Sequence, residues 1–161
     1  MKQQLEATSA VDYKQLKVAS SVFDENDFIP AKYSCEGEDV NPPLTIENIP
    51  GEAKTLAIIV DDPDAREATW VHWVMWNIPV THHLKENHVP GVQGINDFGR
   101  QRYNGPCPPR GTHHYYFKIY ALNSVLDIPE DSNKLQLEKA MSNHIIAFGE
   151  RTGLYTRRGN K

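Results

Sequence analysis

Short apolar runs alternate with clusters of turn-forming residues along most of the chain. The segment 55–60 is almost entirely apolar, with Gly51 before it and the acidic pair Asp61-Asp62 after it. Its length and its β-branched residues predict a buried strand rather than a helix. The run 18–23 is predicted as a further strand.

Two longer segments, 70–78 and 113–122, have the two-residue period of β-strands. The first is apolar at successive positions, which is typical of a strand that packed layers cover on both sides. Strict alternation places the residues of this first segment on two faces: Val71, Trp73 and Met75 on one, and His72, Val74, Trp76 and Ile78 on the other.

One helix is predicted near the C-terminus. Asn133 is the expected N-cap, Gln136 lies three residues later as in a capping box, and apolar residues follow at helical spacing. The run 145–148 after the helix is predicted as a short strand, followed by a turn that Gly149 and Gly153 flank.

These elements predict a mainly β protein with six or more short strands and one or two short helices. Because no helices separate the strands, the pattern favours an antiparallel β-sandwich over a parallel α/β sheet. A chain of 161 residues fits one domain. We expect that domain to span residues 16–161, preceded by a polar N-terminal extension over residues 1–15.

Charge and hydropathy exclude two classes of function. The chain has 17 basic and 21 acidic residues and a net charge of −4, without the basic cluster that a nucleic-acid-binding protein needs. Its longest apolar run, 56–60, is far shorter than the ~20 residues of a membrane-spanning helix. Since no secretory signal is recognisable at the N-terminus, we expect a cytoplasmic protein.

The two cysteines, Cys35 and Cys107, lie far apart in the sequence and form no CxxC pair, which excludes a zinc ribbon or a thioredoxin-type redox motif. Distant thiols of this kind are usually reduced in a cytosolic protein. A disulfide between them is the alternative, and the sequence leaves both open.

Polar residues that could bind a ligand gather around the predicted strand ends. The segment 90–111 is about 20 residues long, rich in Gly and Pro, and without a strand or helix pattern, which is typical of a functional loop. Asp62 and Asp64 could merely cap a turn, or one could orient a histidine and favour its charged form. A charged, oriented histidine such as His72 or His113 would suit an anionic ligand.

Two catalytic alternatives use the same residues. Cys107 near His113 could act as a nucleophile, but Cys107 lies between prolines without a helix N-terminus to activate its thiol. Asp62 and Asp64 together with His72 and His113 could hold a metal ion, although they are separated in sequence, so their spacing gives no support to a metal site. We therefore expect no metal, no other cofactor and no enzymatic activity, and keep a metal-dependent or Cys-His hydrolase as the alternative.

A series of short motifs in a fixed order resembles the phosphatidylethanolamine-binding protein family, in its bacterial and archaeal Raf-kinase-inhibitor-like branch. The resemblance covers residues 16–155, and an ordered set of this length is very hard to obtain by chance. The motifs are Ile29-Pro30, Asn41-Pro42-Pro43-Leu44, Asp62-Pro63-Asp64-Ala65, Val71-His72-Trp73, Trp76-Asn77-Ile78-Pro79, Asn96-Asp97-Phe98-Gly99 and Tyr103-Asn104-Gly105-Pro106-Cys107-Pro108-Pro109.

The resemblance implies a Greek-key β-sandwich with a pocket for phosphate, acetate or a phosphorylethanolamine-like head group. It also implies a regulatory or inhibitory role toward a protein kinase or protease, and a possible homodimer. His72 and His113 would donate hydrogen bonds to the anion, and Asp62 would orient His72. The expected ligand-binding residues are Asp62, Asp64, Trp70, His72, Gly105, Cys107, Pro108, His113 and Tyr115.

The chain departs from the family pattern at two positions near this pocket. Arg66 stands where the family usually has proline, and His114 stands where it usually has arginine. Arg66 could bring a positive charge to the pocket mouth, and His114 could change the pocket rim.

Overall fold

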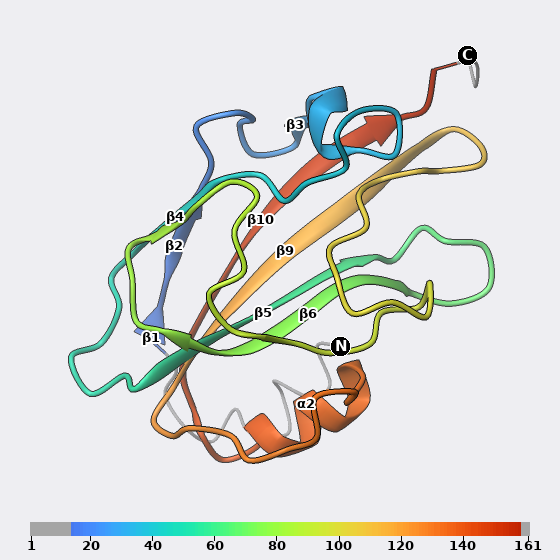
Figure 1. Ribbon diagram of the computed structural model, residues 1–161. Coiled ribbons are helices and arrows are strands. Elements are labelled where there is room, and N and C mark those ends of the chain that lie inside the picture. The colour runs from blue at the N-terminus through green and yellow to red at the C-terminus, as the bar shows by residue number, and fades with distance from the viewer. Residues whose placement is uncertain (1–13, 159–161) are drawn as a thin grey trace.

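Two β-sheets form the framework of the molecule, which we describe from a computed structural model over residues 14–158 (Figure 1). The strands are β1 (Lys14–Gln15), β2 (Lys17–Ala19), β3 (Asp27–Phe28), β4 (Leu44–Glu47), β5 (Thr55–Asp62), β6 (Trp70–Pro79), β7 (His83–Leu84), β8 (Val92–Gln93), β9 (Thr112–Leu122) and β10 (Ile145–Thr156). The helices are the short 3₁₀ turn η1 (Ala31–Tyr33) and α2 (Lys134–Met141).

The larger sheet has the order β1-β10-β9-β5-β6-β8, with β3 also paired to β10, and the smaller sheet has the order β2-β4-β7. After the β5–β6 pair the chain returns to place β9 on the other side of β5, which is a Greek-key connection. The long strands pair antiparallel. Only the short pairs β1–β10 and β3–β10 run parallel among the described strands. The predicted mainly β sandwich is therefore confirmed.

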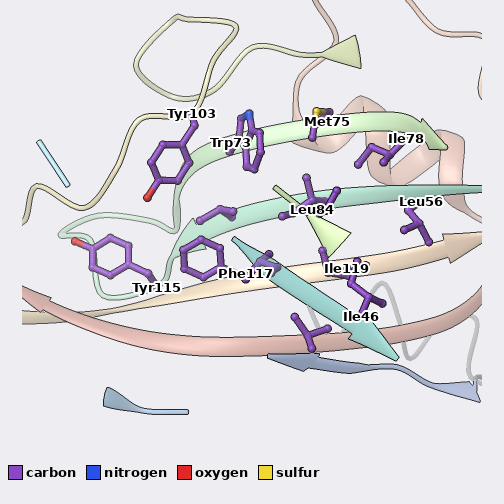
Figure 2. Close-up of a cluster of buried hydrophobic side chains, with 14 of the residues drawn as sticks. Ile46, Leu56, Trp73, Met75, Ile78, Leu84, Tyr103, Tyr115, Phe117 and Ile119 are labelled. Atoms are coloured by element: carbon purple, nitrogen blue, oxygen red, sulfur yellow. The ribbon is translucent and has the colours of Figure 1, made fainter. Parts of the chain in front are cut away.

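Packed layers cover both faces of the larger sheet. On one face, side chains of β5, β6 and β9 pack against the smaller sheet, and Figure 2 shows this cluster around Phe117 and Ile119. On the other face, a second cluster packs against Leu137 and Met141 of α2, which lies below the sheet in Figure 1. A central strand covered on both sides explains why 55–60 and 70–78 are apolar at successive positions.

The helix forms as predicted. The Asn133 side chain accepts a hydrogen bond from the Gln136 backbone N–H at 3.0 Å, and the Gln136 side chain accepts one from the Asn133 N–H at 2.9 Å. This capping box satisfies two N–H groups that the helix geometry leaves without partners. Within residues 14–158, no helix has the length and apolar character needed to cross a bilayer.

The prediction for the C-terminal region is wrong in one respect. No turn follows residue 148; β10 continues unbroken through Gly149 and Gly153. A Cβ atom at Gly149 would lie 2.4 Å from the backbone oxygen of Leu16, so the glycine permits close approach of another chain segment rather than a turn. Of the expected N-terminal extension, residues 1–13 lie outside the described residues, and Lys14–Gln15 form β1.

A side chain at residue 149 should therefore loosen the packing of Leu16 against β10. We expect Gly149→Ala to lower the free energy of unfolding by roughly 1–3 kcal/mol, because the added carbon overpacks a backbone contact. Urea denaturation would measure the change. Gly51→Ala is the matched control, since a Cβ atom there meets nothing within 4 Å. Equal unfolding midpoints for the two variants would contradict this explanation.

Candidate functional site

A cavity of about 850 Å³ opens at one end of the larger sheet. The β5–β6 loop and the segment that leads into β9 lie at this same end of the sheet (Figure 1). The structure brings together eight of the nine predicted residues, which come from distant parts of the chain. They are Asp62, Asp64, Trp70, His72, Cys107, Pro108, His113 and Tyr115.

A β-bulge directs His72 into this cavity. Val60 pairs with Trp73 but Asp61 pairs with Val71, so His72 is an extra residue in β6 that has no partner in β5. Bulges often redirect a side chain beside a functional site. The alternation predicted for 70–78 is therefore broken at His72.

The bulge places His72 on a different face from the one predicted. The ring does not lie with Val74, which packs in the α2-side cluster. Instead it makes edge-to-face contacts with the rings of Tyr115 and Phe98, at centroid distances of 5.3 and 5.2 Å. His72 is thus part of an aromatic wall of the cavity.

The predicted contact between Asp62 and His72 is also wrong. The Asp62 carboxylate accepts a 2.6 Å hydrogen bond from Nδ1 of His113, whereas Nδ1 of His72 lies 2.6 Å from the backbone oxygen of Asn104. Asp62 therefore orients His113. The pairing of strands explains why Asp62 contacts His113 and not His72. Strand β9 lies directly beside β5 and brings His113 to the end of β5.

His72 is unsuited to the donor role predicted for it. Because a carbonyl oxygen can only accept, Nδ1 of His72 carries the proton in its contact with Asn104. Burial lowers the pKa of His72, against the opposing effect of that hydrogen bond, so the ring is neutral near pH 7. Its Nε2 atom then carries a lone pair and cannot donate to an anion.

Tyr115 provides a buried donor that makes no hydrogen bond. The residue is 1% exposed, and its hydroxyl oxygen lies within reach of the Asp62 carboxylate and the Cys107 backbone but in good hydrogen-bonding geometry with neither. Burial, and then the charge of Asp62, raise the pKa of Tyr115, so the hydroxyl keeps its proton. Figure 2 shows this hydroxyl at one end of the buried cluster, pointing away from Phe117. A buried hydroxyl without a partner is costly unless a ligand or water binds it.

A second aspartate–histidine pair lies at the cavity rim. The Asp64 carboxylate accepts two hydrogen bonds from His114, at 2.6 Å from Nδ1 and 2.8 Å from the backbone N–H. Partial burial would raise the pKa of Asp64, but these bonds outweigh it and lower the pKa. His114, which stands where the family usually has arginine, is thus the hydrogen-bond partner of Asp64.

A disulfide joins Cys107, in the cavity wall, to Cys35. The two cysteines are thus bonded rather than present as the free thiols that are usual for a cytosolic protein. The adjacent backbone pairs as well, since the Cys35 N–H donates to the Pro106 oxygen at 3.1 Å. This part of the cavity wall is therefore cross-linked to the segment after η1.

Gly105 does not line the cavity. Its N–H donates to the Asp39 carboxylate at 2.7 Å, and a Cβ atom there would lie 2.0 Å from the Tyr33 backbone oxygen. The glycine is required for close packing behind the cavity wall rather than for ligand contact.

Five lining residues were not among those predicted for the site: Ala65, Arg66, Phe98, Pro109 and Arg110. Each had a signal in the sequence. Ala65, Phe98 and Pro109 lie in the family motifs, Arg66 departs from the family pattern, and Arg110 follows the proline-rich loop. Neither guanidinium forms an ion pair or hydrogen bond with any residue in the described part of the chain.

Comparison with known proteins agrees with this geometry. The sequence model of the family described as "Phosphatidylethanolamine-binding protein" matches residues 19–156. The chain belongs to this family. A UPF0098 protein of Pyrococcus horikoshii is 52% identical over 156 residues, covering 89% of this chain and 77% of that protein. A UPF0098 protein of Methanothermobacter thermautotrophicus is 42% identical over 150 residues, covering 88% of this chain and 99% of that protein.

Solved structures of phosphatidylethanolamine-binding protein homologues share the fold. The Chlamydia trachomatis homologue superposes with a TM-score of 0.86 at 40% identity, covering 89% of this chain and 99% of that one. YbcL of Escherichia coli, described as a member of the mammalian family, superposes with a TM-score of 0.81 at 30% identity, with the same coverage. The resemblance inferred from the ordered motifs is confirmed.

Removing the disulfide should destabilise this family member. We expect the double variant Cys35→Ser, Cys107→Ser to lose about 2–5 kcal/mol of unfolding free energy, because the bond closes a long loop of the unfolded chain. Denaturant titration of the wild type with and without reductant would test the same bond without substitution. An unchanged midpoint, with both thiols shown to be free by mass, would contradict a stabilising disulfide.

The His114→Ala variant should raise the pKa of Asp64 toward its ordinary value of 3.8, because one of the two hydrogen bonds to its carboxylate is lost. In the wild type the pKa is depressed, so the stabilisation is present above that ordinary value and is lost as the pH falls through the folded-state pKa. Carboxyl NMR titration would measure the shift, with His83→Ala as the control. An unchanged Asp64 pKa in His114→Ala would show that the pair has no effect.

Proposed function

We propose that the cavity binds a small anion such as phosphate, acetate or a phosphorylethanolamine-like head group. The observation that carries the proposal is the Tyr115 side chain, which lines the cavity and whose buried hydroxyl has no hydrogen-bond partner among the described residues. A protonated phenol is a donor for an anion, and a bound oxygen would remove the cost of leaving it unpaired. His113 stands beside it, stacked on the Tyr115 ring at 6.4 Å and held through Nδ1 by Asp62.

The charges around the cavity support an anion rather than a cation. Both lining carboxylates are already engaged, Asp62 with His113 and Asp64 with His114. The charged groups left without an ion pair among the described lining residues are the guanidinium groups of Arg66 and Arg110. A negative ligand would therefore find unpaired positive charge at the mouth and a hydroxyl donor inside.

The arrangement favours binding over catalysis. A Cys-His hydrolase would need a free thiolate at Cys107, and its sulfur is bonded to Cys35. The metal-dependent alternative has no support either, since no group of three or more ligand side chains suited to a metal occurs within residues 14–158. We therefore propose a binding protein without enzymatic activity.

The proposal extends to a regulatory or inhibitory role toward a protein kinase or protease, in a cytoplasmic protein that can form a homodimer. Family membership supports the role by analogy. A disulfide is compatible with a cytoplasmic location where intracellular proteins retain disulfides, as in hyperthermophiles. Ligand occupancy of the cavity would then be one way to alter the surface that a protein partner contacts.

Replacing the buried hydroxyl tests the anion site directly. We expect Tyr115→Phe to weaken binding of inorganic phosphate roughly tenfold or more, because one hydrogen bond to a charged ligand is lost while the ring and its packing remain. Calorimetric titration would measure the affinity. Tyr116→Phe is the matched control, since the neighbouring side chain does not line the cavity. Equal phosphate affinity for both variants would overturn the role of Tyr115.

A further inference from the structure

The disulfide between Cys35 and Cys107 is accessible from outside the molecule. Cys35 is exposed, and Cys107 is half-buried in the lining of the cavity. Disulfides that an external thiol can reach are typically the labile or regulatory ones, because reduction begins with direct attack of a thiolate on one of the two sulfur atoms. In this protein the exposed Cys35 is the sulfur that such a thiolate reaches first.

A guanidinium group lies against the other sulfur. Nη1 of Arg157, which directly follows the end of β10, lies 3.7 Å from Sγ of Cys107. A positive charge stabilises a thiolate, and a sulfur that departs as a stabilised thiolate departs faster. Attack on Cys35 therefore releases Cys107 next to a group of opposite charge. Exposure and charge together assign different roles to the two sulfurs.

The segment that carries Cys35 is anchored independently of the disulfide. The Ser34 hydroxyl lies 2.9 Å from the Tyr155 hydroxyl, which in turn donates a hydrogen bond to the Glu36 carboxylate. That carboxylate also accepts a hydrogen bond from the Arg158 backbone N–H at 3.0 Å. Both neighbours of Cys35 are thus tied to the end of β10, which lies beside η1 (Figure 1). Breaking the S–S bond leaves Cys35 in place.

The cavity wall on the other side of the bond has weaker attachments of its own. Pro106, Pro108 and Pro109 have no backbone N–H and cannot donate hydrogen bonds. Residues 105–111 belong to no strand of the described sheets, since β9 begins at Thr112. The covalent bond at Cys107 therefore does much to keep this wall in position beside the Tyr115 hydroxyl.

We propose that the Cys35–Cys107 disulfide is a redox switch that controls ligand binding to the cavity. A dithiol reductant attacks Cys35 and forms a mixed disulfide, and Cys107 leaves as a thiolate beside Arg157. The second thiol of the reductant then attacks the mixed disulfide, which releases the Cys35 sulfur and closes the reductant into its own disulfide. The protein disulfide is reduced to two thiols, the dithiol is oxidised, and its two protons pass to the protein sulfurs or to water.

Reduction weakens anion binding for two reasons. The wall that ends in Cys107 is no longer fixed, so a ligand must order it on binding. The Cys107 thiolate also adds negative charge to the cavity lining, which repels an anion. This effect on binding rests on the proposed anion site and adds a means of regulating it.

Thiol exchange on the folded protein tests the roles of the two sulfurs. The wild type is treated with reduced glutathione without denaturant, free thiols are trapped with iodoacetamide, and peptide masses locate each adduct. We expect glutathione on Cys35 and the alkyl group on Cys107. Glutathione on Cys107 instead, or no reaction until the protein is unfolded, would overturn the proposed switch.

The Arg157→Gln variant tests the effect of charge on the leaving sulfur. We expect dithiothreitol to reduce this variant about threefold more slowly than the wild type, because a positive charge close to the departing thiolate is lost. Arg158→Gln is the matched control, since Arg158 contacts Glu36 through its backbone N–H and carries the same charge one residue further along. Equal reduction rates in the two variants would overturn the role of Arg157.

Phosphate titration of the oxidised and the reduced wild type tests the effect on the cavity. We expect the reduced protein to bind inorganic phosphate roughly two- to tenfold more weakly, which corresponds to the cost of ordering about one side chain. Backbone hydrogen exchange in peptides that cover residues 103–115 should rise on reduction. Near-ultraviolet circular dichroism checks that the reduced protein stays folded, and the double variant Cys35→Ser, Cys107→Ser should not respond to dithiothreitol.

Equal phosphate affinity of the two forms, with both thiols shown to be free by mass, would overturn the switch. Failure of phosphate to bind either form would instead reject the proposed function. Hydrogen exchange then decides whether the disulfide controls the cavity wall: unchanged exchange over residues 103–115 rejects that control, and faster exchange in the reduced protein supports it.

Discussion

Asp61 and Asp62 are adjacent at the end of β5 and both are buried, but their side chains lie on opposite faces of the sheet. Asp61 accepts hydrogen bonds from Lys118 at 2.9 Å and from Lys134 of α2 at 2.8 Å, while Asp62 pairs with His113 inside the cavity. A buried carboxylate must be paired, because an uncompensated charge in the interior costs several kcal/mol. Pairing of Asp61 therefore holds the end of β5 against α2, and pairing of Asp62 holds it against His113 in the cavity.

Other covalent and steric constraints fix the remaining walls of the cavity. The bulge in β6 turns His72 toward Tyr115, and the Cys35–Cys107 disulfide holds the proline-rich wall against the segment after η1. Gly105 allows that wall to pack directly on the Tyr33 backbone. The cavity is therefore largely preformed, and a ligand need not order it on binding, which lowers the entropic cost of association.

Much of this arrangement could be predicted from the sequence, and the errors have specific physical causes. The long strands, the helix cap and eight site residues were predictable because periodicity, capping residues and ordered motifs are local signals. The hydrogen-bond partner of Asp62 could not be predicted, because it depends on which strand lies beside β5. The sheet face on which His72 lies was predicted wrongly, because the alternating pattern gives no sign of a bulge. Gly149 resembles a turn residue until its contact with Leu16 is seen.

A crystal structure of the protein with bound phosphate would show whether the anion reaches Tyr115 and His113. We expect a phosphate oxygen within hydrogen-bonding distance of the Tyr115 hydroxyl and of Nε2 of His113, with Nδ1 of His72 still bonded to the Asn104 oxygen. Phosphate bound only to Arg66 or Arg110 at the rim, with the Tyr115 hydroxyl still unpartnered, would contradict it.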